Sequence, residues 1–212
     1  GVLTKTLLDS HGAMMGDVPD ADTIMRVSKL MATNRSSLME GFFADMITIP
    51  NRLYIFGAGH VAEYLAKTAV IADFEITVID DRRELANRER FPHAGEIILA
   101  NISSAFNCLE FTGGEYVVIA SWSHEQDSAI LGEVLNRETK YVGMIGSKRK
   151  IATIKDQMRK KGIREDLISS IHTPIGVPIN AETPQEIAIS IAAELIKVKN
   201  SAEEMNDKAN EN

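Results

Sequence analysis

Cysteine is almost absent from this chain of 212 residues, whose single copy is Cys108. One thiol excludes an internal disulfide and any CxxC metal site. We expect Cys108 to be buried and to pack as a small apolar residue, because free cysteines are usually buried. The alternative is a thiol that contacts a metal or a sulfur-containing cofactor.

Long apolar runs are lacking too, since none approaches the roughly 18 residues that a membrane-spanning helix needs. The N-terminal segment GVLTKTLLDSHGAMMG has no signal-peptide layout. Positive charge is in deficit, with 23 Lys and Arg against 30 Asp and Glu, whereas nucleic-acid-binding domains usually carry a basic excess. These absences predict a cytoplasmic protein with no membrane attachment and no nucleic-acid partner, in which any anion site is local.

The most informative segment is Leu53 to Arg82, which reads as strand, glycine turn, helix and second strand. The turn GAGHVA fits GxGxxA, a form of the dinucleotide-binding fingerprint. Its first glycine allows a sharp turn, its second lets a pyrophosphate approach the backbone, and Ala62 lets the helix pack close to the sheet. A tight turn that binds nothing is the alternative. The candidate phosphate-binding residues are Gly57, Ala58, Gly59, His60 and Val61.

Acidic residues follow the second expected strand, Glu75 to Ile79. They lie about 20 residues after the turn, where dinucleotide-binding folds have an acid that holds ribose hydroxyls. Asp80 and Asp81 occupy that position, and Arg82 comes next. Because a cation there accommodates a 2′-phosphate, NAD and NADP both stay open as ligands.

Beyond this unit, apolar runs alternate with helical patterns, which predicts an α/β fold with a doubly wound, mostly parallel sheet of the Rossmann type. The near-continuous apolar run Tyr116 to Ala120 suits a parallel strand that is covered on both faces. A capping box at Thr183 to Glu186 predicts the start of a C-terminal helix. The later strands are expected over Glu96 to Ala100, Glu115 to Ser121 and Tyr141 to Ile145, with a helix over Gln126 to Leu135.

The chain divides into three predicted parts. Residues 51–198 form the Rossmann-like domain, residues 1–50 a small N-terminal α+β appendage, and residues 199–212 a flexible polar tail. Within the appendage, which is too short for a stable core of its own, the pattern predicts a strand over Val2 to Leu8, a turn over Gly12 to Gly16 and a helix over Asp22 to Met31.

Two further polar groups follow expected strands at the sheet edge where open α/β sheets bind ligands. Ser121 ends one strand, and His124 follows it. His124 is a candidate base, hydrogen-bond donor to a phosphate, or metal ligand; the alternative is that Ser123 caps the next helix and His124 is only its exposed neighbour. The next strand leads into a basic helix start. Cations there oppose the helix dipole, so a ligand phosphate or an acidic partner surface would compensate; a solvated basic helix is the alternative. The candidate residues are Gly146, Ser147, Lys148 and Arg149.

Five motifs together resemble the C-terminal Rossmann domain of the XdhC/CoxI family, the xanthine dehydrogenase accessory factors. They are FGAGHVA, the DDR that begins at Asp80, NRERFPHA, YVGMIGSKRK and HTPIGVPINAETPQEIAISIAAEL. The resemblance covers about residues 50–198. It departs at Gly176 to Ala181, which reads GVPINA where the family has GLDIGA, so that Asn180 replaces a glycine.

This resemblance implies a chaperone without catalytic residues that binds the molybdenum cofactor (molybdopterin), protects it during installation of its sulfido ligand, and delivers it to a xanthine dehydrogenase-type molybdenum hydroxylase. That hydroxylase and a sulfur-donating enzyme are the implied partners. The residues alone leave two other functions open: an NAD(P)-dependent oxidoreductase with His124 as its general acid or base, and a nucleotide-sensing domain that docks on a hydroxylase. A homodimer also stays open. The histidines show no HxxxH or HxH spacing, so the sequence predicts no preformed metal site.

Overall fold

The computed structural model describes residues 4–8, 13–31, 36–45 and 50–210. Its internal contacts divide the chain into two units: residues 50–200 form one, and residues 1–49 with 201–212 form the other. The larger unit carries the candidate site.

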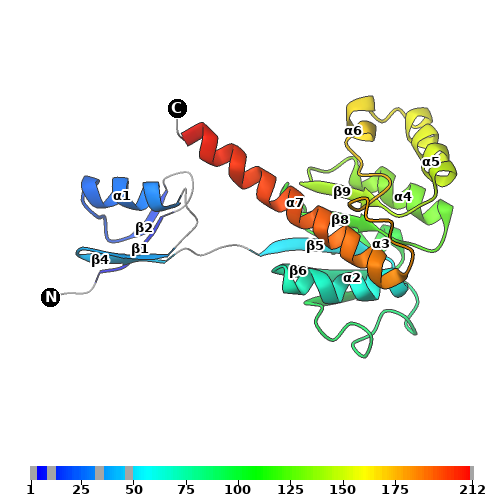
Figure 1. The fold of residues 1–212 in the computed structure, drawn as a ribbon, viewed down its shortest axis with the longest axis horizontal. Helices are drawn as coiled ribbons and strands as arrows, with labels where there is room; N and C mark the ends of the chain where they lie inside the picture. Colours follow the sequence, from blue (N-terminus) through cyan, green and yellow to red (C-terminus); the bar gives the residue numbers. More distant parts are fainter. Residues whose placement is uncertain (1–3, 9–12, 32–35, 46–49, 211–212) are drawn as a thin grey trace. The chain divides into compact units, whose positions relative to one another are not determined.

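The larger unit contains a five-stranded sheet in the order β7-β6-β5-β8-β9, and every neighbouring pair is parallel (Figure 1). The doubly wound α/β sheet that the sequence predicts is therefore confirmed. The strands are β5 (Asn51–Phe56), β6 (Phe74–Asp80), β7 (Glu96–Leu99), β8 (Tyr116–Ile119) and β9 (Tyr141–Met144).

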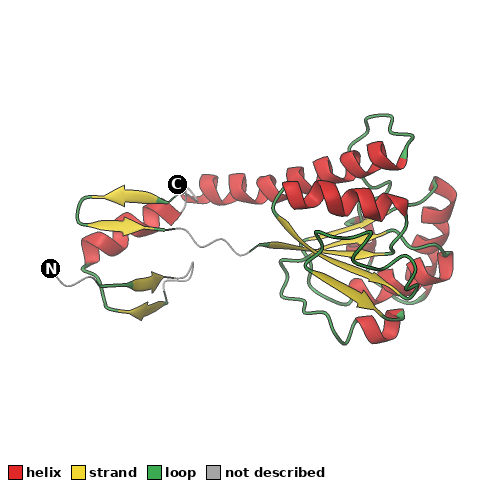
Figure 2. Ribbon diagram, turned by 90° about the horizontal axis from the view of Figure 1, so that it is seen from below, coloured by secondary structure: helices red, strands yellow, loops and turns green. Residues whose placement is uncertain are grey.

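Helices cover both faces of this sheet (Figure 2). Because side chains alternate along a strand, Leu53 and Ile55 join one core, with helices α2 and α7, while Tyr54 and Phe56 join a second core, with α4 and α5. The helices are α2 (His60–Ile71), α3 (Ile102–Ala105), α4 (His124–Val134), α5 (Lys148–Lys160), α6 (Glu165–Ser169) and α7 (Pro184–Asn210).

Successive strands are added to the sheet in one direction from β5 to β7 and in the opposite direction from β8 to β9. The reversal lies at β5, which pairs with β6 on one side and with β8 on the other. The helix that follows β5 packs on one face of the sheet, and the helix that follows β8 packs on the opposite face. This reversal is a topological switch point, and open α/β sheets bind ligands in the crevice at the carboxyl ends of strands there.

The smaller unit is an α+β appendage, as predicted. Strand β1 (Thr6–Leu8) pairs with β2 (Met14–Gly16), helix α1 spans Ala21–Met31, and β3 (Ser37–Met39) pairs with β4 (Phe42–Ala44). The predicted turn at 12–16 is wrong for residues 14–16, which form β2 because their backbone finds a partner in β1; residues 1–3 and 9–12 lie outside the described residues. No residue of α1 is buried, which agrees with a unit too small for its own core.

The C-terminal helix begins with the predicted capping box. The Thr183 hydroxyl accepts a 3.3 Å hydrogen bond from the Glu186 N–H, and the Glu186 carboxylate accepts from the N–H groups of Glu182 and Thr183. Asn180 has a φ of 56°, a left-handed conformation that asparagine adopts more readily than most residues with a Cβ. The helix continues to Asn210, although the composition predicts a flexible tail from residue 199, because extending an existing helix costs little and Ala, Glu, Met and Lys favour it.

Cys108 is exposed, so the prediction of a buried thiol is wrong. Its sulfur lies 3.7 Å from the carbonyl oxygen of Ser104, on the solvent side of the turn that follows α3. Among the helices that the structure describes, none has the length and apolar composition to cross a membrane.

Candidate functional site

Gly57 makes the sharp turn at the end of β5. Its φ is +114°, and a Cβ added there would lie 2.3 Å from the carbonyl oxygen of Ala120. Its N–H donates to the Ile79 carbonyl at 2.8 Å. Only glycine adopts this positive φ readily and has no Cβ to overlap the Ala120 carbonyl, so the turn-forming role that the sequence assigns to this residue is confirmed.

Gly59 differs from Gly57, because it stands at the N-cap of α2 with an ordinary φ of −72°, and a Cβ added to it would meet nothing within 4 Å. No side chain caps this helix, whereas Ser123 caps α4 and Ser147 caps α5. His60 is exposed at the first position of α2. The N-terminus of α2 thus presents backbone N–H donors to open space, which is the arrangement that binds phosphate.

Asp80 is buried beside this turn, with its side chain only 4% exposed. Its Oδ2 accepts from the Ala58 N–H at 2.8 Å and from Arg82 Nη2 at 2.6 Å, and its Oδ1 accepts from the Arg82 N–H and Nε, each at 2.9 Å. Burial by itself raises the pKa of this carboxyl, but these hydrogen bonds outweigh burial and hold the pKa below its usual value. The acid that the sequence predicts for a ribose therefore already has four protein donors.

Arg90 holds the other side of the turn, a contact that sequence reasoning missed. Its Nη1 donates to the Ala58 carbonyl at 2.8 Å, while its Nε and Nη2 donate to Glu63 of α2 at 3.1 and 2.8 Å. A hydrogen bond from Lys67 is the main cause that lowers the pKa of Glu63. Partial burial acts in the opposite direction, and the hydrogen bond from Arg90 adds to the lowering. The available signal was the NRERFPHA motif, which contains Arg90.

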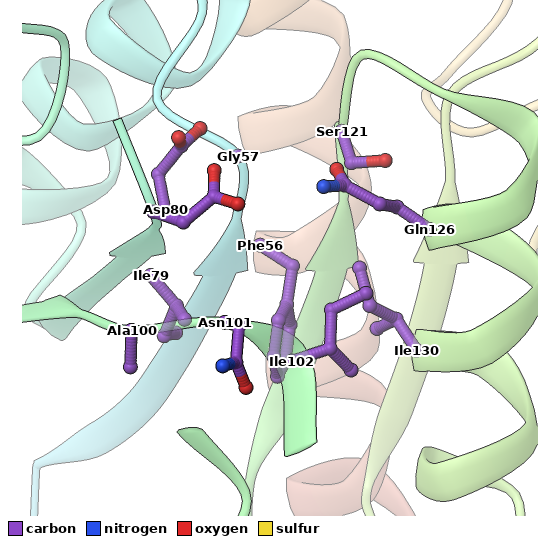
Figure 3. Close-up of a pocket in the computed structure, with 11 residues that line it drawn as sticks. Phe56, Gly57, Ile79, Asp80, Ala100, Asn101, Ile102, Ser121, Gln126 and Ile130 are labelled. Atoms are coloured by element: carbon purple, nitrogen blue, oxygen red, sulfur yellow. The ribbon is translucent and has the colours of Figure 1, made fainter. Parts of the chain in front are cut away.

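A small, open pocket lies at the switch point. Figure 3 shows Asp80 on one side and Ser121 and Gln126 on the other, with Phe56 between them. The predicted residues Gly57, Asp80, Asp81 and Ser121 line it, and the sequence did not predict the remainder of the lining, which comes largely from the segments of α3 and α4. The lining is Phe56, Gly57, Ile79, Asp80, Asp81, Ala100, Asn101, Ile102, Ser121, Gln126 and Ile130.

Beside the pocket, Asp127 of α4 is completely buried, and it contacts one residue from each of the two segments that follow β8 and β9. It accepts a hydrogen bond from the Ser121 hydroxyl and forms an ion pair with Lys150 of α5. The basic helix start is therefore divided: Lys150 points toward a carboxylate of the protein itself, while Lys148 and Arg149 are exposed.

Ser123 and Ser147 serve as helix caps. Ser123 accepts from the Gln126 N–H at 3.0 Å, and Ser147, next to Gly146, accepts from the Lys150 N–H at 3.2 Å. His124 is exposed and is not part of the pocket lining. This matches the alternative in which Ser123 is a cap and His124 is its exposed neighbour.

His172 joins a separate cluster under α7. Its Nδ1 lies 2.6 Å from Glu194 Oε1, and Glu194 also accepts from the Tyr141 hydroxyl and the Gly176 N–H. Burial, together with the charge of Glu194, raises the pKa of Tyr141. The cluster attaches α7 to β9, and no group of His, Cys, Asp and Glu side chains within the described residues is arranged to hold a metal ion.

Comparison with known proteins supports this description. Residues 53–195 match the family model described as the XdhC Rossmann domain. The chain is 38% identical over 152 residues to the uncharacterized protein YqeB of Escherichia coli K12, covering 71% of this chain and 28% of that protein. It is 26% identical over 186 residues to a protein of Bacillus subtilis 168 named as a probable xanthine dehydrogenase subunit, covering 87% of this chain and 54% of that protein.

The chain thus spans 28% and 54% of the lengths of these two curated relatives. A solved structure described as a xanthine dehydrogenase from Bacillus halodurans is similar with a TM-score of 0.65 and 22% identity, over 89% of this chain and 67% of that one. This structural likeness supports the fold.

Proposed function

Because the chain belongs to the XdhC family, we propose that it is an accessory protein that binds the molybdenum cofactor during maturation of a xanthine dehydrogenase-type molybdenum hydroxylase. The names of the relatives from Bacillus support a partner of that type. A sulfur-donating enzyme is the second proposed partner. When bound, the cofactor supplies the molybdenum chemistry of the hydroxylase, and this chain holds and shields it.

The observation that carries the proposal is the open, uncapped start of α2 at Gly59. Molybdopterin carries a phosphate and its dinucleotide forms carry a pyrophosphate, and both groups accept hydrogen bonds from backbone N–H donors at a helix N-terminus. Gly59 leaves space for the anion. Gly57 and the hydrogen bonds to Ala58 hold the turn in the required shape.

The lining of the pocket beside the turn has residue types that would contact the organic part of such a cofactor. Its walls combine apolar side chains, including Ile79 and Ile130, with the amides of Asn101 and Gln126. Ligand pockets commonly have this composition, in which apolar walls bind a ring and a few polar groups orient it.

An NAD(P)-dependent oxidoreductase is the second candidate, and the acid and cation after β6 favour it. In that case Asp80 would hold a ribose in exchange for one of its four protein donors, and the Arg82 side chain would leave Asp80 to accommodate a 2′-phosphate. Such an enzyme needs a general acid or base near its nicotinamide. The pocket lining offers only Asp80 and Asp81 as ionisable groups, which favours the accessory function.

The decisive experiment is to identify what the protein carries when purified from cells that make the molybdenum cofactor. Native mass spectrometry should detect a bound pterin in the wild type and none in Gly59→Val, because the branched side chain fills the anion space. Gly114→Val is the matched control, since Gly114 is exposed, has ordinary φ, and has only Thr112 within 4 Å of an added Cβ.

A nicotinamide nucleotide in place of the pterin would move the assignment to the oxidoreductase. An unchanged pterin content in folded Gly59→Val would remove the glycine turn from the cofactor site.

A further inference from the structure

Trp122 is the only tryptophan in the chain, and it is 66% exposed. It directly follows Ser121, which lines the pocket after β8. An exposed indole is a large apolar surface left in water, and such a surface at a pocket rim is commonly a contact for a ligand. Neither the motifs nor the fingerprint singles out this residue.

Arg82 lies over the indole, with its guanidinium carbon 5.9 Å from the ring centroid, near the outer limit of a cation–π contact of about 6 Å. Arg82 follows β6 and Trp122 follows β8, and these strands flank β5 on opposite sides. The two side chains therefore meet across the carboxyl end of β5, where the glycine turn begins.

Asp80 orients this contact. It binds Nε and Nη2 of Arg82, so the guanidinium is held by its edge. A guanidinium is planar and delocalised, and it associates with aromatic faces as flat heterocycles do. Arg82 thus places a planar group over an indole that is still largely exposed, next to the site proposed for a phosphate.

We propose that Trp122, which lies next to the pocket lining and outside it, forms an aromatic wall on which a planar nitrogen heterocycle, a purine or a pterin, stacks in place of Arg82 while its diphosphate lies at the glycine turn. This assignment rests on the proposed function insofar as that function makes the turn a phosphate site. Stacking on an aromatic side chain recognises the flat face that purines and pterins share, so binding studies must separate them.

The test uses three probes on the full chain: ADP, 6-hydroxymethylpterin diphosphate, and inorganic pyrophosphate, which has no ring. Because Trp122 is the sole tryptophan, its fluorescence reports directly on the wall. We expect a ring-bearing probe to change the fluorescence strongly and pyrophosphate to change it little. The ring-bearing probe with the lower Kd in these titrations identifies the natural class of heterocycle, because the size of the fluorescence change also depends on the absorption spectrum of the ring.

Calorimetry of variants then measures the contribution of the wall. Trp122→Ala should weaken the ring-bearing probe by about 5- to 150-fold, the range for loss of one base-aromatic stack, and leave pyrophosphate unchanged. Trp122→Phe should retain most of the affinity. Ile71→Ala is the matched control, because Ile71 is an exposed large apolar residue at the last position of α2, at the opposite end of that helix from the glycine turn.

The outcomes separate the two proposals. Ring-bearing probes that bind wild type and Trp122→Ala equally well would overturn the aromatic wall and leave the phosphate site standing. Retained probe affinity with lost binding to a hydroxylase would assign Trp122 to a protein contact and also overturn it. If none of the three probes binds wild type, the phosphate site fails and the wall fails with it.

Discussion

Replacement by alanine should destabilise the protein strongly at Gly57 and change its stability little at Gly59. Alanine at Gly57 has two costs. The φ of +114° is a backbone conformation that costs a residue with a Cβ about 1–3 kcal/mol, and the new Cβ would overlap the Ala120 carbonyl, a backbone atom, for about 1–3 kcal/mol more. Gly57→Ala should therefore lower the free energy of unfolding by about 2–6 kcal/mol.

Gly59→Ala should change the same free energy by less than about 1 kcal/mol. Alanine is a poorer N-cap than glycine, but it also restricts the unfolded chain by about 0.4–1 kcal/mol, and the two effects oppose each other. The open space beside Gly59 adds no steric cost.

Urea denaturation followed by far-ultraviolet circular dichroism measures this contrast. With a slope of about 2 kcal/mol per molar urea, Gly57→Ala should lower the midpoint by about 1–3 M, and Gly59→Ala should lie close to wild type. A Gly57→Ala midpoint equal to wild type, or equal losses in the two variants, would refute the assignment of Gly57 to the fold and Gly59 to the ligand.

Three further changes test the surroundings of the turn. Asp80→Asn should destabilise the protein at neutral pH, and the difference from wild type in denaturant midpoint should shrink as pH falls below about 4, since a carboxyl whose pKa is lowered by folding loses its contribution on protonation; a gap independent of pH would contradict this. Asp127→Ala should cost about 2–3 kcal/mol in chemical denaturation, below the range for a fully buried pair because Lys150 is 16% exposed and can reach water, and a neutral effect would show that the pair is unimportant. Lys148→Glu with Arg149→Glu should leave cofactor affinity unchanged but slow association with the hydroxylase in surface plasmon resonance, and the wild-type rate should fall with salt; equal rates would make these residues a solvated surface.

The sequence predicts those parts of the site that depend on local patterns. The glycine spacing, the apolar run before it and the acid after the second strand are all contained within Leu53 to Arg82, and they predict the turn, α2 and the position of Asp80. The capping box at Thr183 is local in the same way.

The features that the sequence did not predict are of two kinds. Some are contacts between residues distant in sequence, and others are opposite orientations of neighbouring side chains within one turn of a helix. Arg90 reaches the Ala58 carbonyl from 32 residues away, and no spacing rule predicts that contact. Lys150 points inward while its neighbours Lys148 and Arg149 are exposed, because the buried Asp127 lies on the adjacent helix. Cys108 is exposed for a similar reason, since the side of a short turn that faces solvent follows from packing.

The two peptide groups that flank the Ala58 Cα are each held by a side chain, since the Ala58 N–H donates to Asp80 and the Ala58 C=O accepts from Arg90. A loop held in this way has little conformational freedom left to lose when a ligand arrives, so the entropic cost of ordering it is met during folding. Recognition at the turn should then occur in a single bimolecular step, with an observed rate that rises linearly with ligand concentration. Replacing Arg90 should introduce a slow rearrangement and make that rate level off.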